Sequence, residues 1–563
     1  MSWLRDLMVR MKYEGVRQGK TRTAREVYRD AGELQGEIED WVRTAENERE
    51  KDLLWRLHQI PVLKNLGANL TAIKNLLGNS GDLDIRTFVV GARNPVRCAL
   101  VFVEGMSDKH VIRESILKPL MHLGRQEEPS RGFSSATAFE VIRDFSLSAG
   151  DVEEVRDIRE VLNSVLSGDS ALFVEGEPRA MIVASKGFKH RSITEPDTET
   201  IIRGPREAFV EAIRVNTSLT RRRLKTHNLR VDEIKVGYLS ETKVAVLYVK
   251  GLAQEDLVRE VKDRLGRIQT DTILDSGYLE DYIEDHPFSP FPQVQNTERP
   301  DKVAAALAEG RVAILADGSP FALIVPTTFH MFLQAPEDYY ERPHIAVLLR
   351  SIRWFSLVLA LVFPSFYVAA TTFHQEMIPT SLALSIAAGR QGVPFPAVVE
   401  ALTMEVLFEI LREAGVRLPR MIGNAISIVG ALVLGQAAVA AGIVSPIMVI
   451  VVGVTAIASF VVPAFSAAIS VRILRFPMMV FAASLGLYGV MWFSLLIMIH
   501  LVSMRSFGVA YLSPMAPLQV GNLKDFYVRV PWWAMYTRPK PFGRRDPKRA
   551  ELRQKPGPPT ERP

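Results

Sequence analysis

The chain changes abruptly from a water-soluble to a lipid-compatible composition near residue 350. Up to about residue 345 the composition is that of a soluble protein, and a run without charge, WFSLVLALVFPSFYVAA, begins at Trp354. Further apolar blocks follow at about 422–443, 446–470 and 477–501. Each is long enough, or nearly so, to cross a hydrocarbon core of about 30 Å. The sequence predicts a soluble region followed by an α-helical, multi-spanning membrane domain.

Several features place the soluble region in the cytosol. The first residues, MSWLRDLMVRMKYEG, lack the long uncharged core of a signal peptide. Cys98 is the single cysteine, so neither an intramolecular disulfide nor a thiolate metal cluster is expected. We interpret Cys98 as a small buried hydrophobic residue in a strand-like run. No cofactor and no metal site are expected.

The two ends of the chain are predicted to be charged extensions. Residues 1–64 are rich in Glu, Arg, Leu and Ala, and opposite charges at i and i+4, such as Glu39 and Arg43, predict a helical N-terminal extension. Residues 521–563 form a basic, Pro-rich tail, where the chain's net charge of +5 gathers. Because basic segments stay on the cytosolic side of a membrane, we expect the tail to be cytosolic.

The soluble region contains one pattern twice. A strand leading to Val103-Glu-Gly105 and its following helix match a strand leading to Val249-Lys-Gly251 and its helix. Further on, Glu175-Gly-Glu-Pro178 matches Asp317-Gly-Ser-Pro320, and an acidic residue before Gly with Pro two positions later is typical of a turn between paired strands. The repetition predicts two similar α/β subdomains. Their predicted ranges are 65–215 and 216–345.

Two charged clusters have simpler interpretations than a binding site. Glu195, Asp197 and Glu199 alternate in a Pro-containing loop, which favours a solvated connector over a cation site. Arg221-Arg-Arg223 ends a plausible helix without the interleaved aromatics of a nucleic-acid surface, so we expect a basic helix end or salt bridges between domains. No phosphate loop, and no nucleophile with a base partner, stands out. We expect no nucleic-acid partner and no enzymatic activity.

Ionisable residues inside the membrane domain, predicted at 346–520, point most directly to function. Such groups are costly in lipid unless they face protein or water. The segment 397–415 predicts a helix on which Glu405, Glu409 and Glu413 share one face. The candidate ion-path or gating residues are Glu400, Glu405, Glu409, His374 and Glu376.

Two interpretations of the segment 397–415 stay open. It lies in the membrane interface with its acidic face in water, or it is a re-entrant or lumen-lining helix that offers cations a ring of carboxylates in an oligomer. The positions of Lys and Arg predict that both chain ends are cytosolic, which requires an additional crossing or re-entry. We predict four to six membrane segments.

Several motifs resemble the A subunit of GerA-type spore germination receptors. In the membrane domain they are Phe373-His-Gln-Glu-Met-Ile-Pro-Thr380, Gly392-Val-Pro-Phe-Pro396, Phe408–Pro419, Ser427–Gly435, Arg505–Gly508 and Tyr511–Pro514. In the soluble region they are Asp84–Arg86, Glu195–Glu199, Arg203–Pro205, Thr297–Asp301 and Asp317–Phe321. The resemblance covers about 65–535. The N-terminal extension and the basic tail exceed the family's usual core.

The resemblance implies a multi-pass protein of the spore inner membrane that acts with two partners. They are a transporter-like B subunit, to which nutrient recognition is attributed, and a C-subunit lipoprotein. The A subunit is expected to form a homo-oligomeric, nutrient-gated cation channel whose ion release triggers germination. The alternatives are a non-conducting scaffold or signal-transducing subunit, and a SpoVAF-type amplifier of ion release. A secondary transporter fits less well because no paired inverted repeats are found in the membrane region.

Overall fold

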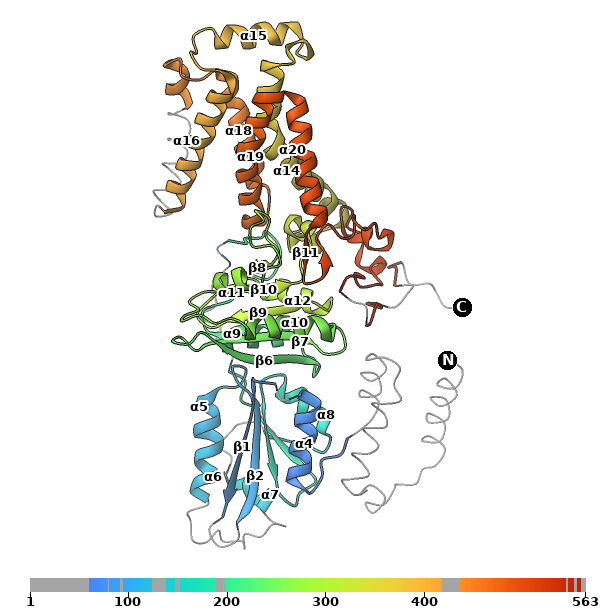
Figure 1. The fold of residues 1–563 in the computed structure, drawn as a ribbon. Coiled ribbons are helices and arrows are strands. Elements are labelled where there is room, and N and C mark those ends of the chain that lie inside the picture. The colour runs from blue at the N-terminus through green and yellow to red at the C-terminus, as the bar shows by residue number, and fades with distance from the viewer. Residues whose placement is uncertain are drawn as a thin grey trace, which may run out of the picture.

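The computed structural model describes residues 60–78, 80–91, 95–123, 138–146, 152–187, 196, 198–417, 435–542, 545–550 and 554–557. The predicted N-terminal extension and the apolar block at 422–443 lie largely outside these ranges. Two α/β units are stacked end to end and are followed by a bundle of long helices (Figure 1). The prediction of an α/β region followed by a helical region is confirmed.

The first α/β unit is a five-stranded antiparallel sheet in the order β1-β2-β4-β5-β3, with helices on both faces (Figure 1). The strands are β1 (Leu83–Val90), β2 (Val96–Val103), β3 (Val152–Val155), β4 (Ser170–Val174) and β5 (Ala180–Val183). The helices are α4 (Leu66–Leu77), α5 (Lys109–Val111), the π-helix η1 (Ile112–Leu117), α6 (Lys118–Leu123), α7 (Ala138–Val141), the π-helix η2 (Ile142–Ser146) and α8 (Ile158–Val165).

Local sequence signals define α4. The side chain of Asn65 accepts a hydrogen bond from the Ala68 N–H and caps the first turn. Gly78 ends the helix in the left-handed conformation, with φ of 70°. Leu66 and Ile73 are buried on one face of the helix, against the sheet. A capping side chain at one end and a left-handed glycine at the other thus define the helix.

The second unit repeats the first. Its five strands follow the order β6-β7-β9-β10-β8, which is the order of the first sheet. The strands are β6 (Leu229–Val236), β7 (Thr242–Val249), β8 (Gln295–Thr297), β9 (Val312–Ala316) and β10 (Ala322–Val325). The helices are α9 (Ile213–Arg223), α10 (Glu255–Gly266), α11 (Ser276–Ile283) and α12 (Pro300–Ala308).

The acidic-Gly turns lie where the sequence predicts them. They join β4 to β5 and β9 to β10, and both pairs are antiparallel. Gly176 and Gly318 have φ of 90° and 89°. A residue with a Cβ rarely adopts these angles, so the glycines are required by the turns.

A buried ion pair joins the two units. Arg221, near the end of α9, binds Asp82 through Nε and through Nη2, which lies 2.8 Å from Oδ1, and Nη2 also donates to Ser80 Oγ at 2.8 Å. The side chains of Asp82 and Arg221 are 1% and 2% exposed. The sequence left two interpretations of the arginine cluster, a basic helix end or salt bridges between domains. Arg221 forms a salt bridge between the two units.

The acidic loop before the second unit acts as a connector where it is described. Glu195 and Asp197 lie outside the described residues. Glu199 pairs with Lys302 Nζ at 2.6 Å and accepts a hydrogen bond from Thr297 Oγ1. These contacts tie the loop to the start of α12.

The C-terminal region is a helical bundle. Its helices are α14 (Pro343–Thr372), α15 (Thr380–Arg390), α16 (Ala397–Arg417), α18 (Pro446–Phe460), α19 (Phe465–Leu485) and α20 (Leu487–Ser503). In Figure 1, α15 lies across the end far from the α/β units, and α16 runs along the side of the bundle. Among the described helices, α14 and α19 are long and apolar enough to cross a membrane, whereas α18 and α20 are shorter apolar helices. The number of membrane segments stays a prediction.

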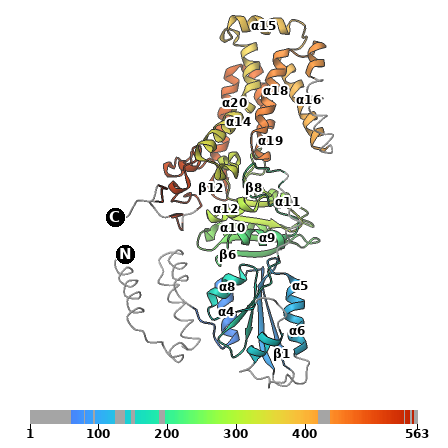
Figure 2. The same cartoon turned by 180° about the vertical axis from the view of Figure 1, so that it is seen from behind.

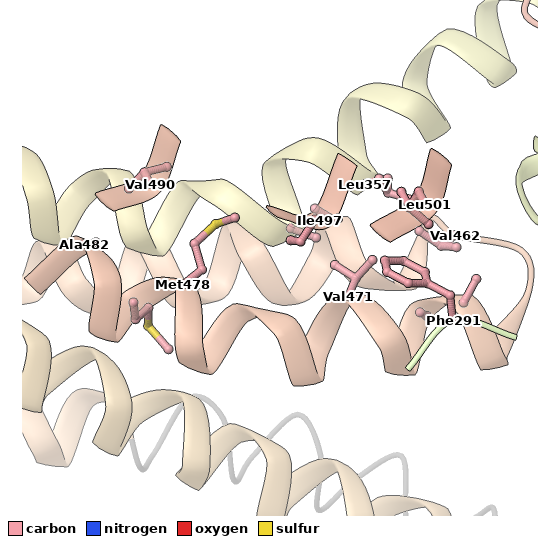
Figure 3. Close-up of a cluster of buried hydrophobic side chains, with 14 of the residues drawn as sticks. Phe291, Leu357, Val462, Val471, Met478, Ala482, Val490, Ile497 and Leu501 are labelled. Carbon is pink, nitrogen blue, oxygen red and sulfur yellow. The ribbon is translucent and has the colours of Figure 1, made fainter. Parts of the chain in front are cut away.

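The core of the bundle continues into the second α/β unit. Figure 3 shows Val471 and Met478 of α19 in one cluster with Ile497 and Leu501 of α20. Phe291, from the loop before β8, belongs to the same cluster. Buried apolar contact at this position joins the bundle directly to the soluble unit.

The chain after α20 packs beside the second unit rather than forming a free tail (Figures 1 and 2). Its short elements are β11 (Arg505–Ser506), β12 (Val509–Ala510) and the 3-10 helices η5 (Val520–Asp525) and η6 (Trp532–Ala534). Arg538 Nε donates to the Ala308 carbonyl at 2.9 Å. Arg549 pairs with Glu309 at 3.8 Å.

Candidate functional site

The candidate carboxylates lie on α16. This helix begins after the Pro-containing turn at Gly392–Pro396, and Pro396 O accepts its first hydrogen bonds. The buried small residues Ala397 and Ala401 allow α16 to pack closely on the bundle. It contacts α14, α18 and α19. In the single chain α16 is therefore a packed helix of the bundle, and both interpretations of its place in the membrane stay predictions.

Glu400 connects three elements at the α15 end of the bundle. Its carboxylate lies 3.2 Å from Arg390 Nε, at the end of α15, and accepts a hydrogen bond of 3.0 Å from the Ser445 N–H, just before α18. The residue is 1% exposed. A buried charge needs such partners because water cannot solvate it.

Glu405 lies one turn further along and is equally buried. Arg475 of α19 donates to its carboxylate at 2.5 Å. Arg475 Nε also donates to the Ala360 carbonyl of α14 at 2.7 Å. One ion pair thus holds α14, α16 and α19 together.

Glu409 forms ion pairs with two arginines. Arg472 of α19 donates to one carboxylate oxygen, and Arg412 of α16 lies 3.3 Å from the other. Arg412 also donates to Ser459 Oγ of α18 at 3.0 Å and stacks on Phe460. We call the five charged residues that join α16 to α19 the ion-pair seam. They are Glu405, Glu409, Arg412, Arg472 and Arg475.

The seam contains three arginines and two glutamates, so its formal charge is +1. In the single chain, Glu400, Glu405 and Glu409 each have a guanidinium partner, while Oε1 of Glu400 and of Glu405 is buried without a hydrogen bond. The Glu405–Arg475 pair is buried, whereas Glu409 is partly exposed. Removing one partner of the buried pair leaves the other charge uncompensated, which is much costlier than losing an exposed pair. The seam therefore favours one packing of α16 against α19.

His374 and Glu376 lie apart from the seam. They follow α14 at the end of the bundle remote from the α/β units, where His374 contacts the turn at Gly486. Glu376 is exposed in the 3-10 helix η4 (Gln375–Met377). In the described part of the chain no hydrogen bond or ion pair joins either residue to the α16 carboxylates. No metal-binding group of three or more His, Cys, Asp or Glu is found among the same residues.

A second charged cluster, at the start of α14, was not predicted. Arg350 and Arg353 are among the basic residues whose positions predict the membrane topology. Both bind Asp338 of α13 (Glu337–Tyr340), Arg350 Nε at 3.1 Å and Arg353 Nη1 at 2.7 Å, and Arg350 also pairs with Asp525 at 3.0 Å. All except Asp525 are buried. The spacing of three residues, which places both arginines on one helical face, was the signal available in the sequence.

Comparison with known proteins identifies the family. The family described as Bacillus/Clostridium GerA spore germination protein matches residues 71–541. The chain belongs to the GerA family. Spore germination protein KA of Bacillus subtilis (strain 168) is 46% identical over 504 residues, which cover 89% of this chain and 91% of that protein. Most of this chain thus aligns with most of that GerA relative.

Other relatives are also similar in sequence to this chain. Spore germination protein GerLA of Bacillus cereus is 40% identical, covering 84% of this chain and 95% of that protein. The uncharacterized membrane protein YfkQ of B. subtilis (strain 168) is 44% identical, covering 88% and 95%. A crystal structure of the N-terminal domain of the A subunit of the Bacillus megaterium spore germinant receptor GerK3 is 36% identical, covers 48% of this chain and 98% of that one, and has a TM-score of 0.39.

Proposed function

We propose that this GerA-family chain is the A subunit of a nutrient germinant receptor in the spore inner membrane. In this proposal it acts with a transporter-like B subunit and a C-subunit lipoprotein. It forms a homo-oligomeric cation channel that opens in response to nutrient. The family match and the named relatives support the role in germination. The membrane helices and their buried charges support the channel.

The observation that carries the channel proposal is the ion-pair seam. Buried charges at membrane depth are rare and mark ion pathways or moving elements. Glu405 and Glu409 hold α16 against α19 only while Arg475 and Arg472 face them. We propose that the pairs favour the closed packing, and that a shift of α16 on opening turns the carboxylates toward the cation path.

An oligomer provides the path. A single bundle encloses its charges in protein contacts, whereas a ring of subunits around one axis creates a shared lumen. In this arrangement Glu400, Glu405 and Glu409 act near the path. Exposed Glu376 and nearby His374 lie at its outer end. A partner that binds nutrient opens the ring only if it binds the open arrangement more tightly.

Potassium efflux from sealed liposomes tests the proposal. The liposomes contain the chain alone or with its B and C partners, with and without candidate nutrients. We expect efflux to rise with nutrient only in the full complex. Glu405→Gln loosens the closed packing but leaves Arg475 as an uncompensated cation beside the path. The nutrient-opened complex should therefore conduct less, and a barrier higher by about 1.4 kcal/mol lowers its flux about ten-fold. Glu409→Gln acts in the same direction.

Glu413→Gln is the matched control, because it makes the same change at an exposed position of the same helix. It is expected to leave the flux unchanged. Absence of flux from a correctly assembled complex would refute conduction. The non-conducting scaffold would then be preferred, since each of the three carboxylates already has an arginine partner that fixes the bundle.

A further inference from the structure

A cavity lies where the helical bundle meets the second α/β unit, beside the ion-pair seam. Its volume is about 350 Å³. The bundle contributes Arg353 of α14, the end of α16, the turn between α18 and α19, and the first turns of α19. The soluble side contributes the segments 198–201 and 334–337.

The bundle side of this junction cavity presents three arginines, Arg353, Arg412 and Arg472, of which Arg412 and Arg472 share Glu409 as their carboxylate partner. Two positive charges against one negative charge leave a local surplus of +1. The Nε atoms of Arg412 and Arg472 are buried and have no hydrogen-bond partner. Arg472 is only 9% exposed. An anion in the cavity would supply the missing countercharge to the two guanidinium groups.

The acidic residues of the soluble wall do not compensate this surplus. Glu337 pairs with Arg353 at 3.0 Å, and Arg353 is also bound by Asp338. Glu199 is occupied by Lys302 at 2.6 Å. Glu337 and Glu199 thus each already have a cationic partner.

The start of α19 adds to the attraction for an anion. Phe465, the first residue of this 21-residue helix, lines the cavity. The N-cap residue is Ala464, so no side chain accepts a hydrogen bond from the free N–H groups of the first turn. Unpaired N–H groups and the helix dipole favour an anion at this end of a helix.

Exposed aromatic residues beside the arginines indicate which kind of anion is bound. Phe460 and Phe465 line the cavity, yet they are 68% and 65% exposed. Ile457, one turn before Phe460 on α18, is 69% exposed. A free phosphate ion gains nothing from these side chains. A phospholipid has acyl chains that cover such side chains while its phosphate reaches the guanidinium groups.

We propose that the junction cavity binds the phosphate of an anionic phospholipid. Arg412 and Arg472 hold the phosphate, with the N-terminus of α19 beside it. The acyl chains cover Phe460, Phe465 and Ile457. The bound lipid fills the gap between the bundle and the soluble unit at the point where Glu409 holds its two arginines. The proposal rests on the proposed membrane embedding of the bundle but does not require ion conduction.

Native mass spectrometry of the full-length protein tests the lipid site. The protein is purified in detergent and equilibrated with equal amounts of phosphatidylglycerol and phosphatidylcholine. We expect phosphatidylglycerol to be retained preferentially. Removing one guanidinium costs about five-fold in that preference, so Arg472→Gln and Arg412→Gln should each reduce it by about this factor. Each variant leaves Glu409 with its other arginine.

Arg505→Gln is the matched control, because Arg505 is exposed after α20 and does not line the cavity. It should leave the preference unchanged. Equal retention of both lipids by the wild-type protein would overturn the proposal. Inorganic phosphate that displaces phosphatidylglycerol completely would identify a free-phosphate site and overturn the lipid assignment.

The outcomes also separate this proposal from the proposed function. Preferential retention without nutrient-dependent flux would refute the channel and leave the lipid site intact. Nutrient-dependent flux with equal retention of the two lipids would support the channel and refute the lipid site. Recovery of the native protein without membrane or detergent would refute the membrane embedding on which both depend.

Discussion

Asp82 shows how a single buried charge can determine a domain junction. Burial raises the pKa of its carboxyl, but the positive charge and hydrogen bonds of Arg221 outweigh burial and lower the pKa below its ordinary value of 3.8. The ionised form is thus the stable one in the folded protein. Because both partners are buried, this pair differs in kind from the ion pairs on the surface.

Asp82→Asn should loosen the junction. It leaves Arg221 buried without a countercharge, and breaking a buried pair in this way costs about 3–5 kcal/mol. Hydrogen–deuterium exchange of the full-length protein should therefore be faster in peptides from β1 and α9. Asp82→Asn combined with Arg221→Met should recover part of the loss, because no unpaired charge then remains.

Exposed Glu241, which pairs with Lys235, provides the control for this prediction. Glu241→Gln should leave exchange unchanged. The wild-type junction should also depend on pH. Since the folded-state pKa of Asp82 is lowered, its contribution is fully present above about pH 4 and is lost as the pH falls through the folded-state pKa. Protection at β1, corrected for the intrinsic pH dependence of amide exchange, that does not fall as the pH drops below 4 would contradict this assignment.

Single residues also show what could be predicted locally. Cys98 is fully buried in β2, as its apolar surroundings indicate, and burial raises the pKa of its thiol to about 12. The position of Glu405 on a helical face was predicted as well. Its partner Arg475 was not, because 70 residues separate the two in sequence and only folding brings them together.

At the scale of elements, the contact of α20 with α19 depends on a glycine. A Cβ at Gly489 would lie 2.1 Å from the carbonyl oxygen of Phe481, which is backbone and cannot rotate away. Gly489→Ala should push α20 off α19 and lower stability by about 1–3 kcal/mol, as overpacking does. The measurement is the thermal unfolding midpoint of the protein in detergent.

Gly453→Ala is the control for this substitution. A Cβ at Gly453 of α18 would have nothing within 4 Å. Alanine favours a helix over glycine by about 1 kcal/mol, so the unfolding midpoint should stay the same or rise. Equal midpoints for the two variants would show that close packing at Gly489 does not hold α20.

Elements with local signals were predictable, and elements with non-local partners were not. Asn65 caps the start of α4 and Gly78 caps its end, both through contacts within a few residues. The strand order of the second sheet could not be derived from the repeated sequence pattern, because strand order depends on which strands form hydrogen bonds with each other. The placement of α16 depended on arginines from α19.

The whole molecule places the α/β units at one end of the bundle and α15 at the other (Figure 1). The proposed membrane orientation puts the α/β units in the cytosol and exposed Glu376 outside. Glu376→Cys should then react with a membrane-impermeant maleimide added to intact cells. Tyr238→Cys, at a position 84% exposed in the second α/β unit, should react only after the membrane is permeabilised.

Wild-type protein is the background control, because Cys98 is buried and its raised pKa keeps the thiol protonated. It should not react in either condition. Labelling of Glu376→Cys only after permeabilisation would contradict the orientation. Labelling of Tyr238→Cys in intact cells would contradict the cytosolic location of the second unit.

The sequence by itself determined the division into an α/β region and a helical region, the repeated turns, and the family. These follow from composition, short-range periodicity and contiguous motifs, all of which are local along the chain. Tertiary structure alone decided that Arg221 meets Asp82, that Glu405 and Glu409 face arginines, and that the C-terminal segment packs on the second unit. Such pairings join residues far apart in sequence, so they depend on how the packed elements bury their charges.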